Sequence, residues 1–194
     1  TAMDWMSPQA RRIHRMESEE PEEETTLLRH TFRLLQADYM WNVPSYTRWL
    51  LAQDMLPVVG FHKTMLQIFD RVNPKPRATR WLLKDPVHLF TVEEILKVYP
   101  DACIVQTHRD PRQILASNCS LVAAMRVMFS DEIEPAVLGQ ETLQFWAQGM
   151  TRMRSARRRH AEAGRTGTFL DVYFKDVVAD PVAQVLYIYE SFGL

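Results

Sequence analysis

Glycine and cysteine are scarce in this 194-residue chain, and no long apolar run occurs in it. None of the six glycines belongs to a loop that is followed by a lysine and a serine or threonine, which excludes the common phosphate-binding loop. The two cysteines, Cys103 and Cys119, have neither metal-binding nor redox spacing, so we expect both in the core and a reducing, cytoplasmic setting.

Other absences concern partners. No apolar stretch reaches the ~18 residues of a membrane span, and no secretory signal is expected at the start. The net charge of −1 gives no general attraction to nucleic acid or anionic lipid, so neither is an expected partner. No cluster of His, Cys and Asp has ligand spacing, and no metal is expected. No sequence feature fixes the oligomeric state.

An acidic segment, residues 1–24, opens the chain. Six glutamates crowd around Pro21, and we expect them to be solvated and the segment to be mobile, or to form the first turn of a helix. The alternative is that one of these glutamates is a catalytic base. The 46% apolar content favours one globular domain over the whole chain.

Apolar periodicity and turn residues predict an α/β fold. Helices are expected to form a cap over 27–40, 46–51 and 61–72, before a linker at 73–76. Strands are expected over 78–83, 102–105 and 169–174. Further helices are expected over 91–99 and 135–163, and two more begin at 111 and at 181. In the last helix we expect three side chains to pack inward: Val185, Leu186 and Ile188. Strands that alternate with helices imply a parallel sheet.

The segment from His108 to Ser117 is the most informative one. It follows a short, buried-type strand, and Asp110 and Pro111 are a helix N-cap and a first helical residue. Arg109 therefore stands at the carboxyl end of a strand, where open α/β sheets bind ligands, and Ser117 lies two turns further on. The pair suits a phosphate. The alternative is that Arg109 caps a carboxylate and Ser117 only packs.

Three motifs in order resemble the sulfotransferases that use 3′-phosphoadenosine 5′-phosphosulfate (PAPS). The stretch from Cys103 through Arg109 to Ser117 resembles their 3′-phosphate-binding segment, 80–86 resembles their strand that ends in a lysine, and 171–181 resembles a segment after a later strand. The resemblance covers roughly residues 40–194. It implies a three-layer sheet of the P-loop-NTPase type flanked by helices, a nucleotide-binding transferase with PAPS as co-substrate, and Arg109 and Ser117 on its 3′-phosphate.

Two departures from that family matter. The loop that normally precedes these motifs and cradles the 5′-phosphosulfate is missing, so we interpret 1–194 as a single but partial sulfotransferase domain that alone binds the donor poorly. On the adenine side, Phe174 stands where the family usually has tyrosine, and it keeps a stacking face without the hydroxyl.

The resemblance implies a catalytic lysine, and proton transfer from the acceptor calls for a base. Lys84 is expected to stabilise the charge that develops on the leaving phosphate, unless it is a surface lysine paired with Asp85. His88, four residues later, is the first candidate for the base that takes the proton of the hydroxyl or amine acceptor, and His62 is a weaker one. His108 is expected to orient the turn.

Further alternatives remain open from the residues alone. The arginines in the second half of the 135–163 helix form a solvated face or contact an anion. Trp41, Tyr46, Trp49 and Phe61 form core or line a pocket for a small-molecule acceptor. A P-loop-type kinase of nucleotides or small molecules shares the sheet, and a non-catalytic nucleotide-binding domain would show no turnover.

Overall fold

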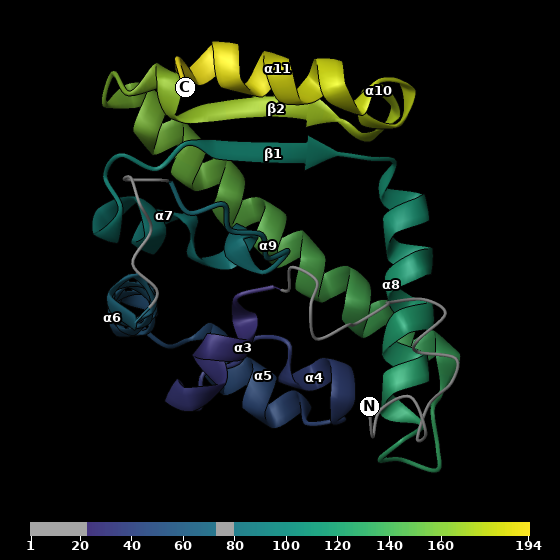
Figure 1. Cartoon of the computed structure of the whole chain (residues 1–194). Coiled ribbons are helices and arrows are strands. Elements are labelled where there is room, and N and C mark those ends of the chain that lie inside the picture. Colours follow the sequence, from purple (N-terminus) through teal and green to yellow (C-terminus); the bar gives the residue numbers. More distant parts are fainter. Residues whose placement is uncertain (1–22, 73–79) are drawn as a thin grey trace.

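The computed structural model describes residues 23–72 and 80–194. The acidic residues before Glu23 and the expected linker lie outside these ranges. At one end of the molecule, short helices form the cap (Figure 1). They are α3 (Thr25–Leu28), the 3-10 helix η1 (Arg29–Thr31), α4 (Ala37–Met40), α5 (Pro44–Leu51) and α6 (Leu56–Val72).

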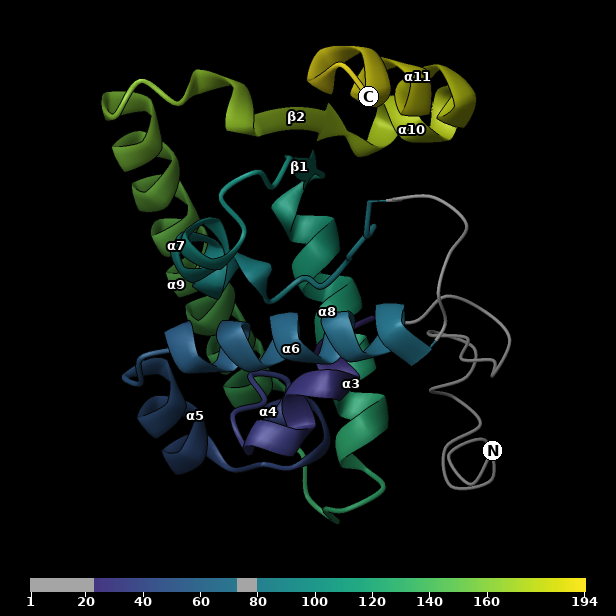
Figure 2. The same ribbon diagram turned by 60° about the vertical axis from the view of Figure 1, so that its left-hand side comes forward.

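A parallel pair of strands lies at the other end (Figures 1 and 2). Strand β1 (Ile104–His108) pairs with β2 (Phe169–Tyr173), and in this register His108 lies opposite Tyr173. The chain continues from β2 into α10 (Phe174–Ala179) and α11 (Pro181–Phe192). The expected α/β class with a parallel sheet and a helical cap is confirmed.

Long helices connect the two ends. Helix α7 (His88–Val98) packs against α9 (Pro135–Glu162), and α8 (Pro111–Arg126) leaves the end of β1 (Figure 2). Asp110 caps α8 as predicted, since its carboxylate accepts the N–H of Arg112 at 2.9 Å. No helix of the described residues is long and apolar enough to cross a membrane.

Three predicted elements differ in the structure. Arg80–Lys84 forms no strand, because a strand needs a neighbour for its backbone groups and β1 pairs only with β2 among the described residues; Leu82 is 97% exposed. The predicted 27–40 helix is broken at Phe32, whose φ of 54° is left-handed. Helix α7 begins at His88, before the expected cap Thr91, because the Asp85 carboxylate accepts the N–H of Val87 at 2.9 Å.

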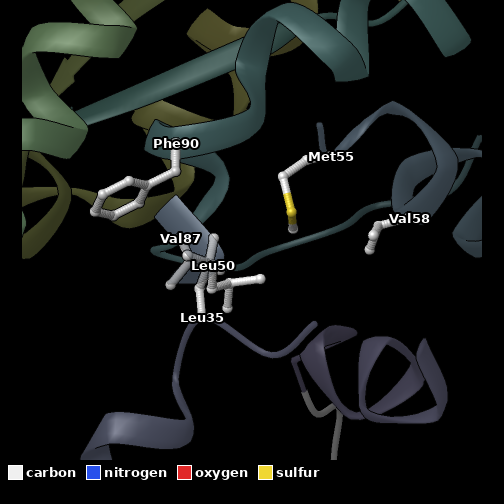
Figure 3. Packing of buried hydrophobic residues seen from close by; sticks show 6 residues of the cluster. All are labelled: Leu35, Leu50, Met55, Val58, Val87 and Phe90. Atoms are coloured by element: carbon white, nitrogen blue, oxygen red, sulfur yellow. The ribbon is translucent and has the colours of Figure 1, made fainter. Parts of the chain in front are cut away.

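The core joins the cap to α7. Its main cluster consists of buried residues from the cap, the segment before α7 and α7 itself: Leu35, Leu50, Met55, Val58, Val87 and Phe90 (Figure 3). A second cluster, Val92, Met153 and Ala156, supports Ile104 and Phe169 of the sheet. The segment that contains Lys84 is therefore anchored by buried Val87 just after it.

Two predictions of burial are wrong. Val185 and Leu186 of α11 are 50% and 57% exposed, because no described element packs on that side of the helix. Cys103 is exposed and Cys119 is only partly buried, so neither belongs to the core; both thiols are free. The apolar character of these residues therefore did not predict their burial.

Candidate functional site

The carboxyl ends of the two strands bring two predicted site residues together. Arg109 follows β1 directly and Phe174 follows β2 directly, and the parallel register sets these positions side by side. The guanidinium carbon of Arg109 lies 4.5 Å from the centroid of the Phe174 ring. A cation and an exposed aromatic face thus share the edge of the sheet where α/β folds bind ligands.

The side chain of Arg109 remains available to an anion. Its Nε donates to Oε1 of Gln113 at 3.1 Å, and the residue is exposed. It therefore pairs with an amide, while the turn's own carboxylate, Asp110, is bound by Arg112 at 2.6 Å. The alternative role of Arg109 as the cap of a carboxylate in the turn is not what the structure shows.

Ser117 lies on an exposed part of α8, about 9 Å along the helix axis from Pro111 at 1.5 Å per residue. Its exposure disagrees with the alternative that it is a packing residue.

An ionic network joins the end of β1 to the middle of β2 and to α9. Nε2 of His108 lies 2.6 Å from Oδ1 of Asp171, and Arg157 of α9 forks onto both oxygens of Asp171 at 2.5 and 2.8 Å. Hydrogen bonding from Arg157, above all, holds the pKa of Asp171 well below its usual range, against a smaller effect of burial. His108 thus ties the end of β1 to β2 directly before Arg109.

Lys84 and His88 form a second group with two glutamates. The exposed ammonium of Lys84 pairs with Glu23, which corrects the alternative pairing with Asp85. Nε2 of His88 lies 2.6 Å from Oε1 of Glu24, and Oε2 of Glu24 accepts the backbone N–H of Lys84 at 3.0 Å. Contacts between the described residues do not join this group to Arg109 and Phe174.

The charges of this group perturb one another. Burial disfavours the charged ring of His88, but pairing with Glu24 and the field of Asp85 outweigh it, so the pKa of His88 is raised. Burial likewise opposes the Glu24 carboxylate, yet His88 and backbone N–H groups hold the pKa of Glu24 below its usual value. Each group therefore favours the charged form of the other.

Asp85 supports the loop between Lys84 and His88. Its Oδ1 accepts Nε2 of Gln36 and the N–H of Val87, both at 2.9 Å, whereas its buried Oδ2 receives no hydrogen bond from any described residue. Burial is the main cause that raises the pKa of Asp85 to about 6. The loop is thus fixed to the cap by a carboxyl group that is costly to ionise.

His62, the weaker candidate base, lies inside the fold. It is 6% exposed, and its Nδ1 lies 3.0 Å from the Tyr99 hydroxyl. Burial lowers its pKa, so the ring is held neutral and away from solvent. The position favours a structural histidine.

Four of the five arginines of α9 have protein partners. Arg157 binds Asp171, Arg159 binds Glu93, Arg158 lies 3.7 Å from Glu162, and Arg152 donates to the carbonyl of Leu51. These contacts favour a structural role over an anion site.

The four aromatic residues for which core packing and an acceptor pocket were the alternatives pack on other rings or lie apart from the cavity between α4, α8 and α9. Trp41 packs on Phe129 and Tyr46 on Trp49, and none of these rings lines the cavity of about 20 Å³ between α4, α8 and α9. That cavity holds water-sized volume at most, because a ligand needs far more. The acceptor-binding surface is therefore not identified by these four aromatic residues.

Sequence reasoning missed the specific contribution of Glu24. The acidic run marked six similar glutamates, and no local pattern distinguishes the one that folds against His88, 64 positions later. The start of a helix carries a partial positive charge, so a charged histidine there needs a carboxylate partner. This is the one local signal that points to such a partner for His88. In the described residues, no group of three or more His, Cys, Asp and Glu side chains is arranged to hold a metal.

Comparisons with known proteins agree with the geometry. The profile of the sulfotransferase family matches residues 1–194. The crystal structure of sulfotransferase STF1 from Mycobacterium tuberculosis H37Rv is similar with a TM-score of 0.84 and 35% identity, over 93% of this chain and 48% of that chain. Sulfotransferase STF9 from Mycobacterium avium shares the fold, with a TM-score of 0.79 and 24% identity, over 97% of this chain and 50% of that chain. No curated protein matches the chain significantly. The chain spans about half the length of the two solved structures.

Proposed function

The chain belongs to the sulfotransferase family, and we propose that the full natural protein transfers a sulfuryl group from PAPS to a hydroxyl or amine of a small-molecule acceptor. The observation that carries the proposal is the contact between Arg109 and Phe174. A nucleotide with a 3′-phosphate needs a cation beside an aromatic face, and the paired strand ends supply both.

The donor site in this proposal consists of three residues. Arg109 forks onto the 3′-phosphate, Ser117 donates its hydroxyl to the same group, and Phe174 contacts the adenine. Exposure of all three side chains supports this assignment, since a nucleotide must reach them from solvent. We interpret residues 1–194 as part of one sulfotransferase domain.

Transfer resembles phosphoryl transfer, in which positioning and charge stabilisation provide most of the catalysis. The acceptor oxygen or nitrogen forms a bond to sulfur while the bond from sulfur to the bridging phosphate oxygen breaks. The leaving phosphate takes the electron pair, and the Lys84 ammonium stabilises the new charge. The acceptor proton moves to the ring of His88. Lys84 is 72% exposed, which supports access to a donor.

The proposal requires no metal, because Lys84 supplies the positive charge. It includes a cytoplasmic location and no nucleic-acid partner. The free thiols of Cys103 and Cys119 support the reducing compartment.

The test is an assay of the full natural protein with PAPS, EDTA and a set of phenol, sugar and amine acceptors. Mass spectrometry then detects any sulfated product. We expect a sulfated product, and a loss of about 10²–10³ in kcat for Lys84→Ala, as for removal of one charge-stabilising donor. Lys97→Ala, a surface lysine 3.7 Å from Glu93, is the matched control and should keep full activity. Phosphorylated product with ATP and Mg²⁺, or tight nucleotide binding with no turnover, contradicts the proposal.

A further inference from the structure

One buried carboxylate contacts both residues to which we assign catalytic roles. Glu24 is 9% exposed and is the N-cap residue of α3 in the cap, whereas Lys84 precedes α7 and His88 is the first residue of α7. Its Oε1 lies 2.6 Å from Nε2 of His88, and its Oε2 accepts the N–H of Lys84 at 3.0 Å. The two oxygens of one side chain thus set the distance between the histidine ring and the lysine backbone.

The short contact also fixes the proton on the ring. A lone pair on Nε2 would repel a carboxylate oxygen at 2.6 Å, so Nε2 carries hydrogen. The contact is close but is not an aligned hydrogen bond, because Oε1 accepts no well-directed N–H from the described residues. In the neutral ring, Nδ1 is then the nitrogen that is left to receive a proton.

Burial makes the ionised carboxylate of Glu24 unfavourable unless a partner of opposite charge stabilises it. Taking a charge out of water carries a large desolvation cost, and a partner of opposite charge must offset it. The groups that face His88 are Glu24 and Glu23 from the segment at the start of the cap, Asp85 from its own loop and His62 from α6. Three of the four are acidic, so His88 sits in a negative field to which Glu24 contributes by direct contact.

We propose that Glu24 is a positioning residue of the sulfuryl-transfer site, which holds His88 with Nδ1 free for the acceptor proton and fixes the backbone of Lys84. The inference rests on the proposed function. As the acceptor bond to sulfur forms, its proton passes to Nδ1, and the carboxylate of Glu24 stabilises the imidazolium that results. A third group that orients a base and stabilises its charged form is a general feature of such relays.

A purely structural Glu24 would tie α3 to α7 without affecting proton transfer. The two roles differ in what they do to the titration of His88 and to kcat at fixed donor affinity. Glu24→Gln separates them, because the amide oxygen still accepts the N–H of Lys84 while the negative charge is lost. The matched control is Glu141→Gln, which also removes a carboxylate beside a cation, 3.2 Å from Arg126 between α8 and α9.

The first measurement needs no variant. Nitrogen-15 NMR of labelled histidine in the full natural protein should show His88 with hydrogen on Nε2 and a pKa above that of a free histidine. In Glu24→Gln the pKa of His88 should fall, and the acid limb of the kcat profile should move to lower pH with it. We expect kcat at its optimum to fall about 10- to 100-fold, which is less than the roughly 10²–10⁴ that a whole acid–base group contributes, with the Kd for adenosine 3′,5′-bisphosphate within about twofold.

Several results would overturn the inference. These are hydrogen on Nδ1 instead of Nε2 in the neutral ring of His88 in the unaltered protein, an unchanged His88 titration in Glu24→Gln, or a changed titration with kcat unaltered. Glu141→Gln should leave both readouts as they were. If the unaltered protein transfers no sulfuryl group, the proposed function fails, while the NMR titration still decides whether Glu24 controls the proton on His88.

Discussion

The guanidinium of Arg109 lies over the ring of Phe174, 4.5 Å from its centroid, although the two residues follow different strands. The parallel pairing of His108 with Tyr173 creates this contact, because Arg109 directly follows His108 and Phe174 directly follows Tyr173. The ionic network of His108, Asp171 and Arg157 joins the end of β1 to the middle of β2. The contact between Arg109 and Phe174 therefore follows from the register of the two strands.

The first prediction concerns Phe174. Phe174→Ala removes the aromatic face for the adenine and the partner of Arg109, and base stacking on an aromatic side chain contributes about 1–3 kcal/mol. We expect the Kd for adenosine 3′,5′-bisphosphate to rise roughly 5- to 150-fold. Phe174→Tyr keeps the face and should bind within about threefold of the unaltered protein. Calorimetric titration measures all three.

The control for Phe174 is Phe129→Ala. Phe129 is 48% exposed and packs on Trp41 near the cap, away from the strand ends. Its removal should leave nucleotide binding unchanged. Equal binding by Phe174→Ala and the unaltered protein contradicts the adenine contact.

Asp85 should make stability depend on pH. Its folded pKa of about 6, raised mainly by burial, lies above the ordinary value near 3.9. The folded state therefore binds this proton more tightly, and the stabilisation is fully present below about pH 4 and lost as pH rises through about 6. Asp85→Asn still accepts from Gln36 and Val87 but never ionises. In urea unfolding, the free energy of unfolding of Asp85→Asn should rise relative to that of the unaltered protein between pH 4.5 and 7.5, by up to about 3 kcal/mol. A difference that is the same at both pH values contradicts this account.

Two glycines of α9 should respond oppositely to alanine. A Cβ at Gly149 would lie 2.9 Å from Cε2 of buried Phe90, whereas a Cβ at Gly139 meets no atom within 4 Å. Gly139→Ala should stabilise the protein by up to about 1 kcal/mol through helix propensity. Gly149→Ala should destabilise it by about 1–3 kcal/mol through overpacking. Thermal unfolding of both variants checks the signs, and stabilisation by Gly149→Ala would show that α7 and α9 are not in close contact there.

Local signals made part of the site predictable. Asp110 and Pro111 mark the start of a helix by cap chemistry alone, and the apolar run before them marks β1, so the position of Arg109 at a strand end follows from about ten neighbouring residues. Phe174 required the family resemblance, and its contact with Arg109 depends on strand register, which the sequence of either strand does not contain.

Features that depend on distant partners were not predictable. Arg80–Lys84 has the composition of a strand but lacks a strand neighbour in the described residues, and Val185 has the spacing of a buried position but no element against it. The pairing of Glu24 with His88 joins the cap to α7 across the sequence, and five other glutamates of the same run look equivalent. Long-range packing, which periodicity does not encode, decided each of these cases.

The most direct test is calorimetric binding of adenosine 3′,5′-bisphosphate and of adenosine 5′-monophosphate to the full natural protein, with Arg109→Ala. Charged hydrogen bonds contribute about 1.5–3 kcal/mol, so we predict that the bisphosphate binds at least about tenfold more tightly and that Arg109→Ala abolishes this preference. Arg112→Ala, whose guanidinium already binds Asp110, should keep it. Equal binding of both nucleotides, or binding of neither, would contradict the 3′-phosphate site and with it the assignment of PAPS as donor.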